Sequence, residues 1–583
     1  GEHMAYRWLD AARYADSDGY ESDPIRTMWP WRDWVIAAFN DNMPYDQFIT
    51  EQLAGDLLPN ASMRQRIASG YNRNNRLNNE GGILAEEWLI ENVADRAETV
   101  ATTFMGLTWG CARCHDHKYD PISQRDYYQL FSYFYNCEES GIGAGASAAG
   151  GMLAVPPLKN LEEYESLGAE LQSIPKKLEA WMDKLVDANW SNLPEALKKK
   201  DREKWSDADK ALARRHFPAK EKLDVYLSKR SAAIKKRRAA LLKAGAKIMV
   251  MKELPKPRQA HVLHRGAFDK PGEKVDTGVP GWIHPVNAEL PKNRIGLAAW
   301  LTDPKHPLTA RVAVNGFWER YFGTGLVKTM EDFGSQGEAP SHPELLDYLA
   351  LAFIDSGWDV KRFQKQIVMS GTYRQSAATN EQLVGRDPDN RLLWRMPARR
   401  MDAETVRDSI LSVSGGLDTT LGGPDIPSAE GLSVPRRSLY FHQSPEDQMS
   451  FLKLFDAADP AECYQRHVSI VPHQALALFN SEISLVHSRR LARRLSKQVT
   501  ETAAFVEAAF RQVLAREVSS QEQQICREFL ENREASYRQA KTPKPPAALV
   551  KTAAAPSIDP RVHARENLIH SIHALRGIII LCA

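Results

Sequence analysis

Residues 111–115 read Cys-Ala-Arg-Cys-His, and this run constrains the local backbone more than any other part of the 583-residue chain. C-x-x-C-H is the pattern of covalent c-type haem attachment, in which two thiols add to the two vinyl groups of one porphyrin. The two-residue gap places Cys111 and Cys114 about one turn apart, and His115 then lies under the iron as its axial ligand. The sequence therefore predicts haem c bound by Cys111, Cys114 and His115.

Two other interpretations of the motif remain open. The thiols could be reduced or form a disulfide beside a surface histidine, or they could form half of a zinc site with His115 or His117. Six cysteines in a chain of this length do not form a disulfide scaffold. The other four, which we expect to be buried or incidental, are Cys137, Cys463, Cys526 and Cys582.

The residues on either side of the motif favour helices. Apolar side chains recur with helical spacing from roughly Glu86 to Leu107, so that a helix leads into Cys111. After the motif, residues 126–135 contain six aromatic residues and predict a second helix. We expect these aromatic side chains to pack in the core, although they could also form the wall of a haem pocket.

The length exceeds what one hydrophobic core supports, and the patterns predict a mainly α, multi-domain protein. We expect a helical N-terminal domain over 1–140 and a helical, coiled-coil insertion over 155–246. A small β-element over 247–291 then links to a helical C-terminal domain over 292–583. The glycine-rich residues 140–155 predict a loop or hinge, and the proline-containing stretch 541–556 predicts a linker.

Individual elements can be assigned within these domains. The Lys/Glu/Ala/Leu-rich residues 160–245 predict a pair of long, exposed helices whose basic runs are solvated. Strands are predicted at Ile248–Met251 and His261–Leu263. The helices predicted in the C-terminal domain are Asn315–Tyr321, Pro343–Phe353, Val360–Met369, Ala403–Val413, Gln474–Leu495 and Ala503–Leu514.

Composition excludes several classes of partner. The formal net charge is only +2, which gives no general attraction to nucleic acid, and no apolar run reaches transmembrane length. The sequence contains no G-x-S-x-G, H-E-x-x-H, dinucleotide fingerprint or phosphate loop. The abrupt start of the chain leads us to expect that it is cut from a longer precursor, so the absence of an export signal says nothing about location. The C-x-x-C-H motif predicts a periplasmic or extracellular location.

Two polar runs are candidates for a substrate-side site. His117, Tyr119 and Asp120 follow the motif directly, and an amide-rich run contributes Asn75, Asn78, Asn79 and Glu80. The amides either satisfy their own loop or line a site. A third run, residues 16–23, has four carboxylates around a glycine; calcium would use such oxygens, but the spacing is not that of an EF-hand. We expect capping and turn formation there.

Longer runs resemble a known family. Residues 8–16, 51–59 and 110–121 look like the planctomycete cytochrome-associated domain. The second half is similar to its usual companion, a planctomycete-specific C-terminal domain, and the matching runs are 293–301, 315–322, 331–346, 370–376 and 471–476. The resemblance covers most of the chain except roughly 155–245. The last residues, 577–583, depart from the usual ending of the family, which suggests a truncated or frameshifted tail.

The resemblance implies an exported protein that typically carries a further N-terminal cytochrome c domain, but it implies no settled activity. Our leading hypothesis is a c-type haem protein in electron transfer or haem-based oxidation. Its partner would be a redox protein or that missing cytochrome domain, and its role could be linked to polysaccharide breakdown. The alternative is a non-haem protein that holds zinc or calcium and binds a glycan or a protein partner. A carbohydrate-active hydrolase is the weaker alternative.

Overall fold

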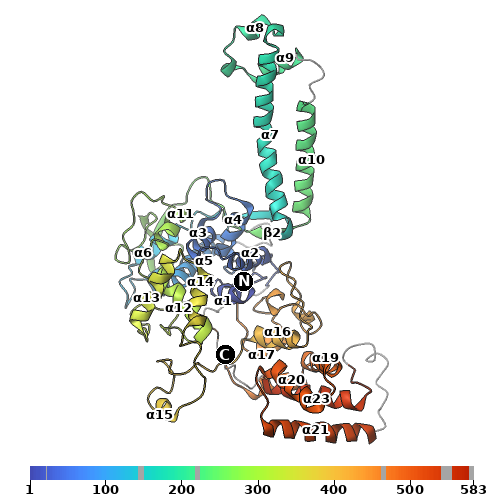
Figure 1. Cartoon of the computed structure of the whole chain (residues 1–583). Helices are drawn as coiled ribbons and strands as arrows, with labels where there is room; N and C mark the ends of the chain where they lie inside the picture. The colour runs from blue at the N-terminus through green and yellow to red at the C-terminus, as the bar shows by residue number, and fades with distance from the viewer. Residues whose placement is uncertain are drawn as a thin grey trace. The chain divides into compact units, whose positions relative to one another are not determined.

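The computed structural model describes residues 1–20, 23–141, 150–216, 223–460, 466, 468–539 and 555–576. The chain forms two compact units: residues 1–61, 65–152 and 249–583 make up the first, and residues 62–64 and 153–248 the second. Figure 1 shows the elements of both units. Residues 142–149 of the predicted glycine-rich loop and 541–554 of the predicted linker lie outside the described residues.

The prediction of a mainly α protein is confirmed, because helices dominate the described residues and the strands there form only two small two-stranded sheets. The first helices along the chain are α1 (Glu2–Ala11), α2 (Trp29–Asn40), α3 (Tyr45–Ala54), α4 (Met63–Ala68), α5 (Ala85–Val100) and α6 (Gln124–Ser132). The later ones are α11 (Arg294–Leu301), α12 (Thr309–Phe322), α13 (Pro343–Asp355), α14 (Val360–Met369), α15 (Glu381–Val384), α16 (Ala403–Val413), α17 (Ser450–Leu454), α18 (Pro472–Asn480), α19 (Glu482–Gln498), α20 (Thr502–Leu514), α21 (Ser520–Gln539) and α23 (Pro560–Arg576).

The first unit is built around an aromatic cluster from its N-terminal helices. The Trp8 ring of α1 lies 5.0 Å from Phe48 of α3, and its Nε1 donates a hydrogen bond to Gln52 Oε1 at 2.8 Å. Tyr45 extends the cluster to α12, where Phe317 lies 5.6 Å away. Edge-to-face pairs of this kind add about 0.5–1.5 kcal/mol beyond the area that they bury. The start of the C-terminal half therefore shares one core with the N-terminal helices.

The end of the C-terminal half has its own core. Buried side chains of α19, α20, α21 and α23, among them Leu491, Phe505 and Ile569, form one hydrophobic cluster. The prediction of a single helix over Gln474–Leu495 is wrong in one respect, because the helix is interrupted at Ser481, between α18 and α19. The Ser481 side chain accepts a hydrogen bond from the Ser484 amide and caps α19. Serine at an N-cap satisfies an amide that would otherwise lack a partner.

The second unit contains two long helices, α7 (Leu161–Ala188) and α10 (Leu223–Lys243), with the short α8 (Glu195–Lys198) and α9 (Asp207–Arg215) between them. An apolar seam that includes Ile174 and Ile234 lies between the long helices. Arg237 Nε forms an ion pair with Glu163 at 2.7 Å along the exposed edge. The basic run at 235–238 thus lies mostly on the outer surface of a helix, as a solvated run would.

The sheets are small. Strand β1 (Met152–Val155) pairs with β2 (Ala246–Met249), and β3 (Ala260–Leu263) pairs with β4 (Pro271–Val275). In the second sheet the strands are antiparallel, and the register shifts between His261 and Leu263. Helix α6 packs against this sheet and lies next to the short turn that carries the C-x-x-C-H motif.

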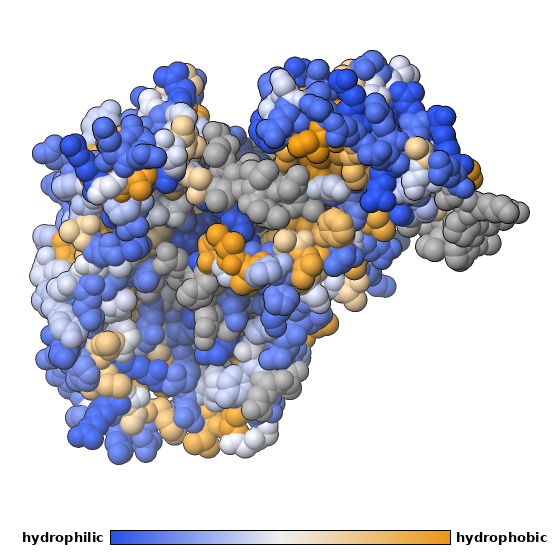
Figure 2. Space-filling model, turned by 90° about the horizontal axis from the view of Figure 1, so that it is seen from below, coloured by the Kyte–Doolittle hydropathy of each residue, from blue (hydrophilic) through white to orange (hydrophobic). Residues whose placement is uncertain are grey.

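The surface is largely hydrophilic. Figure 2 shows one face, on which hydrophobic residues lie in separate patches among hydrophilic ones. Exposed large apolar side chains include Ile25, Val468 and Ile470. None of the helices described is both long and apolar enough to cross a membrane.

Candidate functional site

The C-x-x-C-H motif lies on the surface. The helix predicted to lead into it is present as α5, continued by a π-helical turn at Ala101–Met105, and it ends at Gly106 with a φ of +60°. Cys111 is in a 3-10 turn, Gly110–Arg113, and Cys114 directly follows that turn. Both thiols are free and exposed. They are therefore accessible to a reagent or to a cofactor.

His115 is exposed and has one ring nitrogen available. Its Nδ1 lies 2.7 Å from the carbonyl oxygen of Asp116. A carbonyl only accepts hydrogen bonds, so Nδ1 carries the proton and Nε2 of the neutral ring keeps its lone pair. When a histidine binds a metal through one ring nitrogen, the other ring nitrogen usually donates a hydrogen bond, for example to a backbone carbonyl, and this bond orients the ring.

The structure around the motif is well anchored. Gln124 Nε2 donates hydrogen bonds to the carbonyls of Arg113 and Leu263, both at 2.9 Å, and so links the turn to strand β3. Tyr128 of α6 also donates to the Arg113 carbonyl, at 3.0 Å. Gly266, with a φ of +73°, lies so close that a Cβ there would be 3.0 Å from Cys114 Sγ. Glycine at this position keeps space around the thiol.

Of the predicted polar residues after the motif, two are buried and one is exposed. The buried His117 ring accepts hydrogen bonds at Nδ1 from the amides of Tyr119 and Asp120, at 3.3 and 2.9 Å. Asp120 is also buried, whereas Tyr119 is 52% exposed. Nε2 of His117 and Oδ2 of Asp120 have no hydrogen-bond partner. His117 therefore orders the loop that follows the motif.

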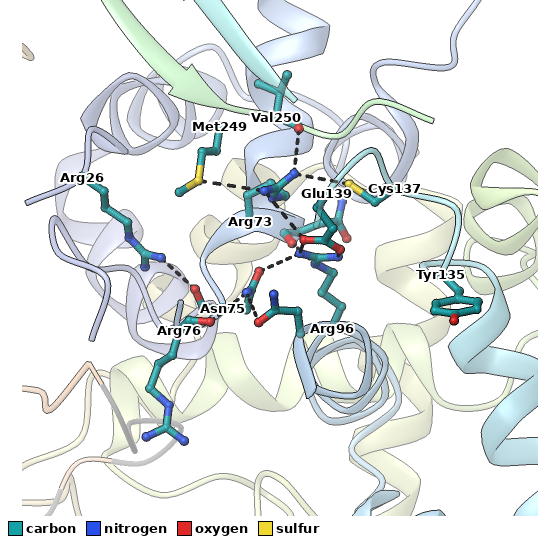
Figure 3. A network of polar contacts seen from close by, with 12 residues as sticks. Arg26, Arg73, Asn75, Arg76, Arg96, Tyr135, Cys137, Glu139, Met249 and Val250 are labelled. Atoms are coloured by element: carbon teal, nitrogen blue, oxygen red, sulfur yellow. Dashed lines mark hydrogen bonds and ion pairs between the residues drawn. The ribbon is translucent and has the colours of Figure 1, made fainter. Parts of the chain in front are cut away.

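The amide-rich run belongs to a buried polar network (Figure 3). Arg96 forms a two-pronged ion pair with Glu139 and also donates to Asn75 Oδ1 at 3.0 Å. Burial alone would raise the pKa of Glu139, but the positive charges of Arg96 and Arg73 lower it. Asn75 therefore orders a charged core.

The other members of the run also have hydrogen-bond partners. Asn79 Nδ2 donates to Asp18 Oδ2 at 2.6 Å, and Asn78 Oδ1 accepts from the Glu80 amide at 2.7 Å. Asp23 accepts hydrogen bonds from the Gly19 amide and from the Ser444 hydroxyl, both at 2.6 Å. The acidic run at 16–23 thus uses its described carboxylates in turns and tertiary hydrogen bonds; Glu21 and Ser22 lie outside the described residues.

A third group of side chains was not predicted as a site. Asp16, Asp425 and His442 bring ligand-type atoms within 4.8 Å of one another, and no other set of three such residues does so in the described chain. His442 Nδ1 lies 2.7 Å from Asp425 Oδ2, and Asp16 is fully buried. The sequence indicated Asp16 only as part of an acidic, turn-forming run, because Asp425 and His442 are more than 400 residues away along the chain.

The charges of this group depend on burial and on one another. Burial raises the pKa of the Asp16 carboxyl to about 6, against the lowering effect of Arg32. Burial would also raise the pKa of Asp425, but the hydrogen bond from His442 lowers it overall. For His442, burial favours the neutral ring, yet Asp425 and Asp16 together raise its pKa. Divergent pKa values of adjacent groups are common at functional sites.

Comparison with known families matches both halves of the chain. Residues 1–139 match PSCyt2, described as "Protein of unknown function (DUF1549)", and residues 293–530 match PSD1, described as "Protein of unknown function (DUF1553)". Neither the curated proteins nor the solved structures give a significant match. The C-x-x-C-H motif and Asp16 lie in the first matched segment, and Asp425 and His442 lie in the second. The chain thus belongs to the planctomycete-type proteins that pair a PSCyt2 domain with a PSD1 domain.

Proposed function

We propose that the protein is an exported electron-transfer protein with a c-type haem attached through Cys111 and Cys114. The observation that supports this most is the state of the donor set. Both thiols are free and exposed, and His115 has Nε2 available while its Nδ1 hydrogen bond orients the ring. This chemistry fits two thioether bonds and one axial nitrogen. Bound there, the haem would supply a reversible one-electron couple.

The spacing of the donor atoms favours haem over zinc. The ligand atoms of Cys111, Cys114 and His115 do not form a cluster within 4.8 Å, unlike those of Asp16, Asp425 and His442. A tetrahedral zinc ion needs bonds of about 2.0–2.3 Å to every ligand, so its ligands must converge on one point. Thioether attachment instead uses two separate vinyl groups, and the thiols need no common centre.

The chain's own residues would hold the haem-bearing turn still. The hydrogen bonds from Gln124 and Tyr128 to the Arg113 carbonyl fix the backbone between the two thiols. An ion pair between Arg113 and Glu91 of α5 fixes the same residue through its side chain. A rigid attachment site of this kind limits reorganisation when an electron arrives or leaves.

The test is a visible spectrum of the chain exported together with c-type maturation machinery. We expect a Soret band that survives acid–organic extraction, and its loss in the Cys111→Ala, Cys114→Ala double variant. Cys526→Ala is the matched control, because Cys526 is buried in the separate C-terminal core. A colourless, folded protein that carries zinc at the motif would overturn the proposal and support the non-haem alternative.

A further inference from the structure

The Asp16, Asp425 and His442 side chains come together because backbone hydrogen bonds place them there. The amide of Ile426 donates to the Tyr440 carbonyl, and the amide of His442 donates to the Ile426 carbonyl, both at 2.8 Å. This short parallel bridge fixes Asp425 beside His442. The Asp16 amide donates to the Gln443 carbonyl at 2.7 Å, and the Gln443 amide donates back to Asp16 Oδ2 at 3.1 Å. The three residues are thus positioned by main chain from both matched domains.

The group is buried but reachable. Asp16 is fully buried, and the side chains of His442 and Asp425 are 8% and 22% exposed. Asp16 and Asp425 are two carboxylates close together in a poorly hydrated place, where the buried Arg32 guanidinium and the His442 ring offset part of their charge. The Tyr14 hydroxyl donates to Asp16 Oδ1 and fixes the orientation of that carboxyl.

Polar atoms next to the group lack partners. Arg32 is fully buried; its Nε donates to Asp33 at 3.0 Å and its Nη2 donates to the Gly423 carbonyl. Its remaining nitrogen, Nη1, has no hydrogen-bond partner, and neither has the buried Ser17 hydroxyl. The guanidinium lies close enough to act electrostatically on Asp16 and Asp425. Buried donors normally have acceptors, and Arg32 Nη1 is an unpartnered buried donor on a guanidinium that acts electrostatically on this group.

We propose that Asp16, Asp425 and His442 bind one divalent transition-metal ion at the junction of the PSCyt2 and PSD1 domains. Two carboxylates and one imidazole suit manganese, iron or zinc better than calcium, which prefers oxygen ligands alone. The adjacent Arg32 charge does not repel the ion strongly, because Asp33 pairs with it at 3.0 Å.

The experiment titrates Mn²⁺ and, separately, Zn²⁺ into the full chain by calorimetry, with Ca²⁺ as a third titrant. The background is the Cys111→Ala, Cys114→Ala variant, so that the thiols cannot contribute and the outcome is independent of the haem proposal. We expect one Mn²⁺ or Zn²⁺ per chain and a higher melting temperature with the ion. His442→Gln and Asp425→Asn should each weaken binding at least about tenfold.

The matched control is Asp418→Asn, because Asp418 is a carboxylate on the same stretch of chain that accepts hydrogen bonds from Thr420 and lies 4.0 Å from Arg436 Nε. Its binding should equal that of the background. Each variant is first compared without metal by circular dichroism and melting temperature, so that loss of fold is not read as loss of a ligand. Undiminished binding in a folded His442→Gln variant would overturn the proposal. So would a folded background protein that binds neither Mn²⁺ nor Zn²⁺, or that binds Ca²⁺ alone.

Discussion

Asp120 Oδ1 accepts a hydrogen bond from the backbone amide of Ser335 at 2.7 Å. The acceptor lies five residues after the C-x-x-C-H motif, and the donor lies in the PSD1 half of the chain. Two residues before Ser335, the amide of Phe333 donates a hydrogen bond to the Gly106 carbonyl at 2.6 Å. The loop that contains Asp332-Phe333-Gly334 is therefore hydrogen-bonded to the chain on both sides of the C-x-x-C-H motif. The C-terminal half thus has a direct structural role at the predicted haem site.

Replacing Asp120 tests the hydrogen bond between the two segments. Asp120→Ala should lower the free energy of unfolding by about 1.5–3 kcal/mol, the range for hydrogen bonds that involve a charged group. Hydrogen exchange of the Ser335 amide should become faster at the same time. The control is Asp269→Ala, since Asp269 is exposed and lies between β3 and β4. Equal exchange rates of the Ser335 amide in the two variants would contradict a stabilising role of this hydrogen bond.

The pair of Arg294 and Asp56 should be the strongest single link between the two halves. Arg294 is fully buried and donates two hydrogen bonds to the Asp56 carboxylate, at 2.7 and 2.8 Å. Arg294→Met leaves that carboxylate unpaired and should cost about 3–5 kcal/mol. Denaturant unfolding measures the loss, and adding Asp56→Asn should recover part of it. A variant as stable as the wild type would show that the pair contributes nothing.

The stability of the protein should fall on acidification because of His306. Its buried ring accepts hydrogen bonds at Nδ1 from the Thr309 amide and hydroxyl, at the start of α12. Burial, helped by His284, lowers the pKa of His306 to about 3. The unfolded state binds this proton below about pH 6.5 and the folded state only near pH 3, so stability declines as pH falls through this window.

His306→Gln removes the titrating group and keeps an acceptor for the helix. We expect the melting temperature of this variant to depend less on pH between 6.5 and 4 than that of the wild type. The exposed His264 provides a control, since His264→Gln should leave the slope unchanged. Identical slopes in wild type and His306→Gln would contradict the assignment.

Gly266 should control access to Cys114. A Cβ at this position would lie 3.0 Å from Cys114 Sγ, and the φ of +73° disfavours any other residue. Gly266→Ala should therefore slow alkylation of Cys114 relative to Cys111, measured by mass spectrometry of labelled peptides. Gly281→Ala is the matched control, because a Cβ there meets nothing within 4 Å. Unchanged relative rates of alkylation would show that residue 266 does not control access to the Cys114 thiol.

Much of the fold could be predicted from local patterns. Apolar periodicity is a local property, and it located α5, α6, α12, α13 and the two long helices of the second unit. The break at Ser481 was missed because the apolar spacing continues through it; the serine that caps α19 is the only local signal. Periodicity also gives no information on which helices share a core, so the packing of Phe317 against Tyr45 could not be foreseen.

The sites divide in the same way. Cys111, Cys114 and His115 are adjacent in sequence, so that spacing alone suggested their chemistry. Asp16 and His442 meet through tertiary structure, and no spacing rule reaches across such a separation. The amides at 75–80 were open to two interpretations, and the buried charge of Arg96 that Asn75 binds could not be inferred from the sequence.

Covalent haem at the motif can be tested through the intact mass of the denatured, exported chain. Denaturation removes any haem that is held only by the fold, whereas thioether bonds persist. We expect a mass increase equal to one haem in the wild type and none in the Cys111→Ala, Cys114→Ala variant. An unmodified mass in folded protein that was exported alongside an active maturation system would contradict it.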